Sequence, residues 1–548
     1  MTKYLFLLLS LLTSSAIAQW PTGEYEAVQL LSKPNWVYLP VAADQAPDGS
    51  VRILVQDSPY GTFGFTAGVL AIDREGNLMW PGELADHPVH ERDNWMGEAN
   101  YIMKCGPNGE TWVVYEDYYG TPDQGGGYYD TPYISARRFD AQGVPNDERL
   151  TVAELNTLHA KIPVHLEVLD DGGMIALWNT KHHEEYEFYE VRAQRYSAEC
   201  EPLWGDGGLL IYEALEGDSA STWSGLSDGT GGFYFGIGNS LAYLEPSGDL
   251  LWDYGDVVVD SASTIISLAW NTDGDEIGLF CGKPLIRYWV SAVNTNGIFI
   301  HGPGTYIDHP YLSLSEFYAT SSGYNLIDKR DQELYRFDQD LNPIGEIVPL
   351  PLVGDASIYQ YTYNSHHGIR ISTKQRTVPC PNNAWVRAYD HDMNFLWTVK
   401  VNEDTTYYHE ILPYLDDYGT TWMFWRVADY DLYQADLYMN VADMDGGWGY
   451  TKVDEYDPLA LLPDDLQPLI YPNPFNNRTT LQFSLNRAGT VSVNIHDILG
   501  RTLFTDSFWR AKGDHTESLS FETFPSGIYF INVENGSHRV TVKTTHLK

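Results

Sequence analysis

Leu70-Ala-Ile-Asp-Arg-Glu-Gly-Asn-Leu-Met-Trp80 is the stretch that decides the fold of this 548-residue chain. An apolar strand signal leads into a turn around Asp73 and Gly76, and a second apolar segment ends at Trp80. The same order recurs at Arg195–Trp204, Ala242–Trp252 and Arg387–Trp397, with weaker copies at Arg138–Gly143, Ala292–Gly297 and Arg336–Leu341. Turns that recur about every 45 to 65 residues have the spacing of four-stranded propeller blades.

A second series of turns precedes the first. Its members are Pro47–Gly49, Pro107–Gly109, Asp170–Gly173, Ser227–Gly229, Thr272–Gly274, Ser322–Gly323 and Asp416–Gly419. A meander of four strands, A to D, produces two such series, one between A and B and one between C and D. We therefore predict an all-β fold, a seven- or eight-bladed β-propeller. Seven blades are clear, and an eighth is split between residues 364–368 and residues from 410 onward.

The four tryptophans of the repeat, Trp80, Trp204, Trp252 and Trp397, are expected to pack between blades. The form Ala-x-Asp-x-x-Gly-x-x-x-Trp at 71–80 resembles the repeats of pyrroloquinoline-quinone-type β-propellers. That resemblance covers short patches of residues 20–455 and concerns architecture. The quinone dehydrogenases of that family carry adjacent cysteines beside the cofactor, whereas the cysteines here lie far apart, at 105, 200, 281 and 380. We predict no quinone cofactor, and either two disulfides or free, buried thiols.

The predicted B-C loops are rich in tyrosines and carboxylates. In a propeller these loops emerge on the same face as the D-A crossings between blades. They span residues 58–65, 117–130, 182–189 and 429–433. A tyrosine ring offers both a flat apolar face and a hydroxyl to a ligand. We therefore predict a ligand-binding rim that includes Tyr118, Tyr119, Tyr128, Tyr129, Tyr186 and Tyr189.

Five histidines complete the predicted rim: His90, His165, His309, His367 and His409. We expect each of them in or beside a D-A crossing. Imidazoles that converge with carboxylates can bind a metal ion or act as acid and base. No two of the five have a diagnostic ligand spacing, so a metal or catalytic role is the less favoured interpretation of these histidines.

Two acidic segments are similar to fragments of calcium loops. Asn271–Glu276 and Asp443–Gly447 each lack part of the full ligand pattern, so we expect hairpin turns at both. We predict no required cofactor, with calcium as the one cation that this acidic chain could take.

The C-terminal segment carries a different pattern. Ile470-Tyr-Pro-Asn-Pro-Phe475 is followed by alternating apolar residues at Leu481–Leu485 and Val491–Ile495, then by Asp497-Ile-Leu-Gly-Arg501 and Phe524–Phe530. Six or seven short strands within about 80 residues predict a small antiparallel, immunoglobulin-like sandwich. In this order the motifs resemble the type A sorting domain of the bacterial type IX secretion system.

The resemblance implies a destination, the cell surface or the medium, and a partner, the type IX machinery. It also implies a set of sorting-signal residues, namely Tyr471, Pro472, Asn473, Pro474, Phe475, Gly500, Gly527 and Lys543. One departure follows Lys543, where the resemblance leads us to expect apolar residues and the chain has Thr544, Thr545 and His546.

The N-terminus agrees with export. A lysine at position 3, an apolar run at 4–12 and Ala16-Ile-Ala18 predict a signal peptide at 1–18, with the mature chain starting at Gln19. No later run is long and apolar enough to predict a transmembrane helix. We predict a propeller at 19–457, a proline-rich linker at 458–470 and the sorting domain at 471–548.

Charge is divided unevenly between these parts. Residues 471–548 hold 6 of the 75 acidic and 8 of the 33 basic residues, a formal charge of +2, and the 69 acidic and 25 basic residues before them give −44. Nucleic acid is an improbable partner for so negative a domain.

Two classes of function remain. In the first, which we favour because no catalytic constellation stands out, the propeller binds an extracellular glycan or protein through the tyrosine- and acid-rich loops. In the second it is a secreted hydrolase or lyase that acts on a polysaccharide or peptide. We expect a monomer in either case. Propellers host both classes, so fold alone does not choose between them.

Overall fold

The computed structural model describes residues 27–547 except for a number of segments, most of them short. The residues outside the description are 1–26, 60–65, 81–83, 91–99, 120–130, 147–149, 154–158, 183–187, 206, 214–223, 260–263, 272–273, 284–286, 301–303, 308–311, 313–315, 321–322, 329, 351–355, 365–366, 376–382, 391–392, 402–406, 430–433, 448–467, 474, 486–488, 498–500, 511–512, 522–523, 536–537 and 548. Within the described residues the one helical element is η1, a 3-10 turn at Leu84–Asp86, and no helix is long and apolar enough to cross a membrane.

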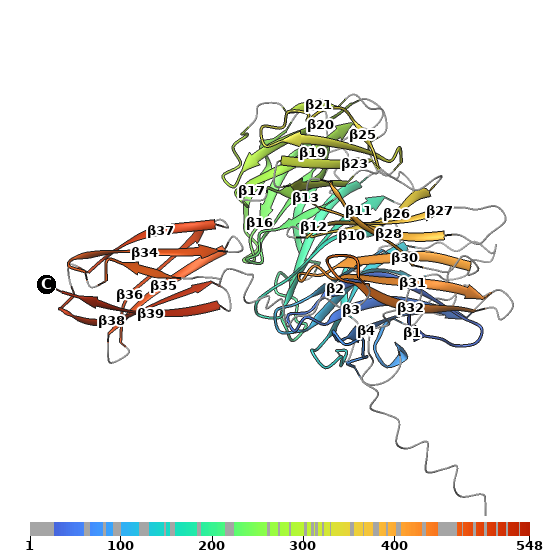
Figure 1. Cartoon of the computed structure of the whole chain (residues 1–548), viewed down its shortest axis with the longest axis horizontal. Coiled ribbons are helices and arrows are strands. Elements are labelled where there is room, and N and C mark those ends of the chain that lie inside the picture. The colour runs from blue at the N-terminus through green and yellow to red at the C-terminus, as the bar shows by residue number, and fades with distance from the viewer. Residues whose placement is uncertain are drawn as a thin grey trace, which may run out of the picture. The chain divides into compact units, whose positions relative to one another are not determined.

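Residues 36–400 form seven consecutive blades of antiparallel strands (Figure 1). The first four blades are β2 (Trp36–Gln45), β3 (Val51–Pro59), β4 (Thr66–Ile72), β5 (Pro88–His90); β6 (Tyr101–Cys105), β7 (Thr111–Tyr119), β8 (Thr131–Phe139), β9 (Leu150–Ala153); β10 (His159–Val168), β11 (Met174–His182), β12 (Phe188–Tyr196), β13 (Leu209–Glu213); and β14 (Gly225–Ser227), β15 (Phe233–Ile237), β16 (Ser240–Leu244), β17 (Leu250–Val258). The next three are β18 (Thr264–Trp270), β19 (Glu276–Lys283), β20 (Arg287–Asn294), β21 (Thr305–Ile307); β22 (Glu316–Thr320), β23 (Gly323–Asp328), β24 (Glu333–Asp338), β25 (Val348–Pro349); and β26 (Ala356–Asn364), β27 (Gly368–Gln375), β28 (Asn383–Tyr389), β29 (Phe395–Lys400).

The eighth blade is built from both ends of this region. Its strands β30 (Tyr407–Leu415), β31 (Thr421–Asp429) and β32 (Gln434–Ala442) are completed by β1 (Val28–Leu31), which pairs antiparallel with β32. Val37 of β2 also forms a parallel bridge with Ala435, so the first and last blades count as one sheet. Consecutive four-stranded meanders whose last blade receives its outer strand from the N-terminus constitute a β-propeller. Of the two predicted blade counts, the described strands give eight.

Both predicted turn series lie where the meander requires them. Pro47–Gly49 lies between β2 and β3. The Asp73 turn follows β4, and an isolated antiparallel bridge between Ile72 and Leu78 closes it. The Asp73 carboxylate accepts the backbone N–H of Asn77 at 2.7 Å, which fixes the turn. The turns of the third, sixth and seventh blades are tight as well, because Cys200, Leu341 and Met393 adopt φ values of 68°, 62° and 62°. The prediction of offset A-B and C-D turns is confirmed.

The tryptophans of the repeat pack on the next blade, as predicted. Trp80 Nε1 donates to Ala141 O at 3.2 Å, in the C-D turn of the second blade. A Cβ on Gly143 in that turn, at φ 83°, would lie 2.3 Å from the Trp80 ring. The same pairing joins Trp204 to Gly248, Trp252 to Gly297 and Trp397 to Gly446. Each turn therefore needs a glycine both for its backbone conformation and for the ring that covers it.

The chain divides into two compact units. One comprises residues 1–114, 136–150 and 352–451, and the other residues 115–135, 151–351 and 452–548. In the first unit, Ile53 and Val55 of β3 pack with Phe424 and Leu437 of the last blade. In the second, Leu177 of the third blade packs with residues of the fourth, and Phe280 of the fifth with residues of the sixth. Apolar side chains between sheets thus form the cores of both units.

The C-terminal domain is a separate sandwich. One sheet has the order β33 (Leu469–Tyr471), β34 (Arg478–Leu485), β37 (Gly513–Ser520), and the other β36 (Thr502–Arg510), β35 (Gly489–Asp497), β38 (Gly527–Asn535), β39 (His538–His546). Alternating residues such as Val491, Val493 and Ile531 are buried between the sheets. The domain begins at Leu469, two residues before the predicted boundary, and the pairing of β38 with β39 ends at Asn535 and His538. Residues 458–467 of the predicted linker lie outside the described residues.

Candidate functional site

The strands that carry the predicted tyrosine-rich rim are described, but its loops are not. The loop at 60–65 joins β3 to β4, and those at 120–130, 183–187 and 430–433 join β7 to β8, β11 to β12 and β31 to β32. Each is therefore a B-C loop, as predicted. Tyr118 and Tyr119 end β7 and Tyr189 lies in β12, without described side chains; Tyr128, Tyr129 and Tyr186 lie outside the described residues.

The five predicted histidines are described to different extents. His90 ends β5 and His409 lies in β30, but their side chains, like all of His309, lie outside the description. Their convergence therefore stays a prediction. The prediction that His367 lies beside a D-A crossing was wrong. Asn364 pairs with Gly368, so His367 lies in the A-B turn of the seventh blade. Gly368 begins β27, so the prediction that residues 364–368 belong to the eighth blade was wrong: they form a turn of the seventh.

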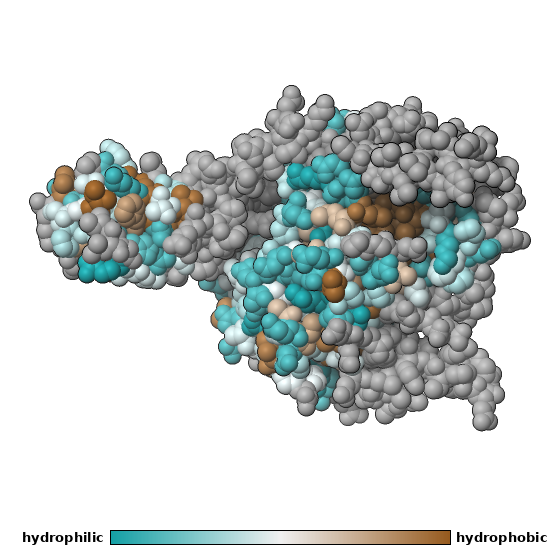
Figure 2. All heavy atoms as spheres, turned by 90° about the horizontal axis from the view of Figure 1, so that it is seen from below, coloured by the Kyte–Doolittle hydropathy of each residue, from teal (hydrophilic) through white to brown (hydrophobic). Residues whose placement is uncertain are grey.

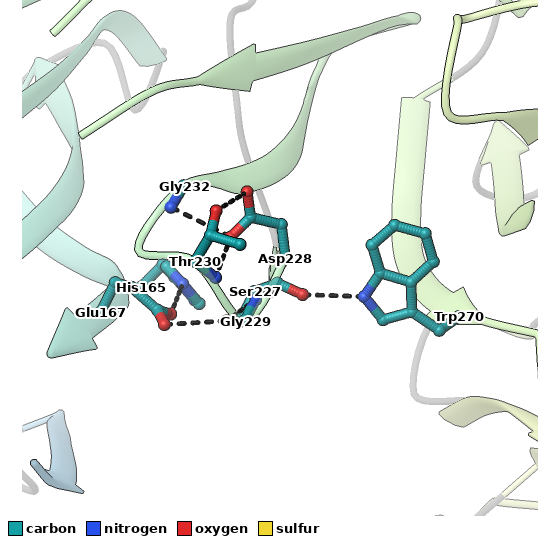
Figure 3. A network of polar contacts seen from close by, with 8 residues as sticks. All are labelled: His165, Glu167, Ser227, Asp228, Gly229, Thr230, Gly232 and Trp270. Atoms are coloured by element: carbon teal, nitrogen blue, oxygen red, sulfur yellow. Dashed lines mark hydrogen bonds and ion pairs between the residues drawn. The ribbon is translucent and has the colours of Figure 1, made fainter. Parts of the chain in front are cut away.

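His165 belongs to a polar network in the second unit (Figure 3). It lies on β10, where the register with β11 shifts between Pro163 and His165. Its Nε2 lies 3.2 Å from Glu167 Oε2, and both side chains are largely buried. The imidazole ring also packs 4.7 Å from the Phe233 ring, centroid to centroid. It covers Gly225, where a Cβ would lie 2.4 Å from the ring.

Glu167 connects this histidine to the A-B turn of the next blade. Its Oε1 accepts the hydroxyl hydrogen bond of Ser227 at 2.8 Å. The backbone carbonyl of Ser227 in turn accepts the indole N–H of Trp270, on β18 of the fifth blade, at 2.7 Å. Three consecutive blades thus meet at Ser227, as Figure 3 shows.

Asp228 organises the turn itself. Its carboxylate accepts the backbone N–H groups of Thr230 at 2.7 Å and Gly232 at 3.1 Å, and the hydroxyl of Tyr243 at 2.5 Å. Burial, together with the charge of Asp228, raises the pKa of Tyr243. Tyr243 therefore stays a hydrogen-bond donor at physiological pH.

The order of these groups determines what the network can do. A serine nucleophile requires its hydroxyl to face a base such as histidine, with a carboxylate behind the base. Here the Ser227 hydroxyl donates to Glu167, and His165 lies on the other oxygen of the same carboxylate. The carboxylate stands where the base would have to be. The geometry is that of a hydrogen-bond network that links neighbouring blades.

A second, partly buried carboxylate lies where the first and last blades meet in the first unit. Asp44 of β2 accepts the backbone N–H of Cys105 on β6 at 2.6 Å and the hydroxyl of Tyr414 on β30 at 3.4 Å. Burial raises the pKa of Asp44, and the nearby Asp417 contributes in the same direction. Sequence reasoning missed this group, because nothing in the local pattern around Asp44 distinguishes it from a surface turn residue.

The metal hypotheses find no support among the described side chains. No group of three or more His, Cys, Asp or Glu residues in that part of the chain is arranged to hold a metal ion. The Asn271 and Asp443 segments are hairpin turns, as expected: Asn271 Oδ1 accepts the N–H of Glu276, and Asp443 Oδ1 that of Gly447. Cys105, Cys200 and Cys281 are thiols that take part in no disulfide bond.

Two of the predicted sorting-signal residues, Asn473 and Lys543, lie near opposite ends of the sandwich sequence, and the Asn473 amide donates to Lys543 O at 3.2 Å. Tyr471, Pro472 and Asn473 are exposed, Phe475 is buried, and Gly527 and Lys543 lie on β38 and β39; Pro474 and Gly500 lie outside the described residues. Thr544 and His546, which depart from the expected apolar pattern, are fully buried. The His546 ring stacks on Phe475 with centroids 5.4 Å apart. An aromatic imidazole therefore fills the position at which an apolar side chain is expected.

Comparison with known proteins identifies this domain. Residues 469–546 match the family described as a secretion system C-terminal sorting domain. The chain therefore carries a type IX sorting domain, and the protein is secreted or displayed at the cell surface. A search of curated proteins found no match to the chain.

Several solved structures match this chain at low sequence identity. The apo prolyl oligopeptidase B from Galerina marginata is 14% identical with a TM-score of 0.39, over 72% of this chain and 56% of that one. The propeller domain of the trilobed protease from Pyrococcus furiosus is 10% identical with a TM-score of 0.35, over 68% of this chain and 98% of that one. The chain thus spans just over half the length of the oligopeptidase. At these TM-scores the likeness supports no inference about activity.

Proposed function

We propose that this exported propeller is a binding protein that takes a glycan or a protein segment on its tyrosine- and acid-rich B-C loops. The observation that carries the proposal is topological. The four loops at 60–65, 120–130, 183–187 and 430–433 all connect the second strand of a blade to the third. Such loops leave a meander at the end opposite to its A-B and C-D turns, and ligand sites on rigid scaffolds are built from loops of this kind.

The charge of the chain restricts the class of ligand that can bind. The residues before 471 carry 69 acidic and 25 basic side chains. A field of this sign repels anionic polysaccharides and attracts basic groups over distances of about a Debye length, roughly 10 Å at 0.1 M salt. A neutral or amino-bearing glycan, or a basic protein segment, is the ligand class that fits.

The alternative is a secreted hydrolase or lyase that uses rim histidines as acid and base. His165 is one of the five histidines on which that hypothesis depends. Its engagement with Glu167 and its packing on Phe233 leave the hypothesis with less support. The binding proposal requires no cofactor, and calcium would enter it only as a ligand of the acidic loops.

The test uses the full mature chain with Tyr118→Ala, Tyr119→Ala, Tyr128→Ala and Tyr129→Ala combined. Screening against neutral, amino-bearing and anionic glycans and against basic and acidic peptides should find a ligand whose affinity falls at least about tenfold in the variant, or about 1.4 kcal/mol. The matched control is Phe395→Ala, because this ring is 54% exposed at the start of β29, beside the C-D turn, and C-D turns lie at the end of a blade opposite to its B-C loop. Equal loss in both variants, or turnover of a bound glycan or peptide, would contradict the proposal.

A further inference from the structure

Two neighbouring blades carry a carboxylate at a turn position where other blades carry an amide. The position is the fifth residue of a C-D turn, whose carbonyl accepts the N–H of the first residue. In the first blade, Asn77 Nδ2 donates from this position to Asp73 Oδ2 at 2.9 Å. The amide of Asn394 makes the same contact within the turn of the seventh blade, also at 2.9 Å. The third and fourth blades have Glu201 and Asp249 instead.

The structure of the two turns does not account for these carboxylates. A carboxylate cannot donate a hydrogen bond, so each of the two turns lacks the amide contact of the other blades. In the fourth blade the first residue of the turn is Glu245, so two acids occupy the pair of positions that form this contact elsewhere. Asp249 accepts the hydroxyl of Ser247 at 3.0 Å, and both Asp249 and Glu201 are exposed. Their negative charge is therefore directed to the solvent or to a partner.

Each carboxylate is followed two residues later by an exposed leucine. Leu203 is 50% exposed and Leu251 is 59% exposed. The pairing of β17 with β16 shifts between Leu250 and Trp252, so Leu251 is the extra residue of a β-bulge, a feature that redirects a side chain. Figure 2 shows that the apolar residues on its visible face lie in patches among hydrophilic ones.

The tryptophan packing between blades brings the two turns together within the second unit. Trp204 follows Leu203 directly and covers Gly248, where a Cβ would lie 2.8 Å from Trp204 Nε1. Gly248 in turn precedes Asp249, so the exposed leucine of the third blade lies beside the turn of the fourth. We call this surface the acidic-apolar patch; it consists of Glu201, Leu203, Asp249 and Leu251.

The charge around the acidic-apolar patch has one sign. Residues 197–213 and 245–259 contain the C-D turns and outer strands of both blades, and they hold no lysine or arginine. Arg195 reaches the junction from β12 and donates to Pro246 O at 2.6 Å, but its guanidinium is paired with Asp171 at 2.7 Å. The patch therefore combines apolar contact area with negative charge that no cation of these two segments neutralises.

We propose that the acidic-apolar patch is a docking surface for a protein segment that carries large apolar side chains together with lysine or arginine. The two leucines supply apolar contact and the two carboxylates supply charge beside it, as in an interface with an apolar centre and a polar rim. The residues before 471 carry −44, which favours a basic partner over a second copy of the chain or an anionic lipid surface. This surface is distinct from the B-C loops, because C-D turns lie at the opposite end of a blade.

Calorimetric titration of the full mature chain with a short synthetic peptide of alternating lysine and leucine tests this proposal. Leu203→Ser combined with Leu251→Ser should weaken binding about tenfold without a change of charge. Glu201→Gln combined with Asp249→Asn should weaken it to a similar extent. Peptides of lysine and serine, or of glutamate and leucine, should bind the native chain more weakly, because each lacks one half of the required chemistry.

Met79→Ser combined with Leu396→Ser is the matched control. These side chains are 42% and 46% exposed at the same position of the repeat, in blades whose turns carry Asn77 and Asn394. The control should keep the native affinity, and so should the variant that lacks the four tyrosines of the B-C loops.

Unchanged binding in the leucine variant, or an equal loss in the control, would overturn the proposal. A loss confined to the variant without the four tyrosines would place the peptide on the B-C loops, which overturns this proposal and leaves the proposed function in place. If the leucine substitutions instead abolished self-association or binding to phosphatidylglycerol vesicles, the occupant would be a second copy or a lipid, and the proposal would be wrong. If the leucine variant fails to fold, the carboxylate variant decides.

Asp249→Asn alone separates recognition from a structural role of the carboxylate. The introduced amide can donate to Glu245 as Asn77 donates to Asp73, so thermal unfolding should show an equal or higher Tm while peptide affinity falls. A lower Tm would show that the Asp249 carboxylate stabilises its turn, and the argument for a partner would fail.

Discussion

Trp397 Nε1 donates a hydrogen bond of 2.8 Å to Met444 O, in the C-D turn of the next blade. Trp80 makes the equivalent contact with Ala141. Because the ring also covers the glycine of that turn, the tryptophan, the carbonyl and the glycine form one repeated unit of blade-to-blade packing. This unit accounts for the sequence repeat, which combines a turn glycine with a tryptophan a few residues later.

Because of this packing, an added methyl group should destabilise the protein more at Gly143 than at Gly205. Gly143→Ala places a Cβ 2.3 Å from the Trp80 ring at φ 83°, whereas Gly205→Ala, at φ 79°, meets no atom within 4 Å. The backbone cost of about 1 to 2 kcal/mol applies to both, and overpacking adds about 1 to 3 kcal/mol to the first alone. Calorimetry should show the larger fall in Tm for Gly143→Ala. Equal falls would mean that the Trp80 ring moves aside freely.

Asp44 should make the stability of the first unit depend on pH. Because its folded pKa is raised, the folded state holds the proton more tightly than the unfolded state, whose value is near 3.8. Stability from this group is therefore present at low pH and is lost as pH rises through the folded pKa. We expect Asp44→Asn to raise Tm at pH 7, with a gain that shrinks as pH falls. Asp445→Asn, on an exposed turn, is the control. A lower Tm for Asp44→Asn at pH 7 would show that the ionised form stabilises the fold.

If the His165 network only links blades, a change in it should lower the stability of the fold without changing ligand affinity. Ser227→Ala removes the hydrogen bond to the largely buried Glu167, and the loss of one such hydrogen bond costs about 1 kcal/mol. Thermal unfolding should report this loss, while affinity for any rim ligand should stay at the native value. Loss of a catalytic activity with Tm unchanged would instead identify Ser227 as a functional residue.

The buried Thr544 hydroxyl predicts a gain in stability. Its Oγ1 is buried without a hydrogen-bond partner, in a position where the family pattern is apolar. Thr544→Val keeps the shape of the side chain and removes the unsatisfied group, which should stabilise the sorting domain by about 1 kcal/mol. Urea unfolding of the full chain, followed by tryptophan fluorescence, measures this gain. The difference in fluorescence between the chain with Trp509 and a Trp509→Phe variant isolates the signal of the sorting domain. A loss of stability would indicate that the hydroxyl is satisfied in solution.

Local sequence specified most of this fold because its determinants repeat. The turn at Asp73 and its copies require a left-handed residue and a capping carboxylate or amide within four positions, and such short-range chemistry is readable from one chain. The long-range strand pairings could not be predicted from the sequence. That β1 completes the last blade could not be deduced from four ordinary apolar residues, because the information lies in their partner β32.

The candidate site was predictable to a smaller extent. The assignment of the tyrosine-rich segments to B-C loops follows from strand order and is confirmed. The position of His367 was wrong, because an A-B turn and a D-A crossing have similar composition and differ only in which strands pair. The Asp44 and Glu167 contacts link blades, and no periodicity in the sequence encodes which side chains of neighbouring blades meet.

The most direct test of the account is where the chain goes when residues 467–548 are deleted. The sorting domain is the part that a known family identifies, and the function proposed for the propeller requires delivery outside the cell. The measurement is the ratio of periplasmic to extracellular protein in a host with the type IX machinery, with protease resistance as the check on folding. The account predicts a folded, signal-processed propeller that is retained in the periplasm, and a reporter fused to the same segment that is exported. Normal amounts of the truncated protein at the surface or in the medium would contradict it.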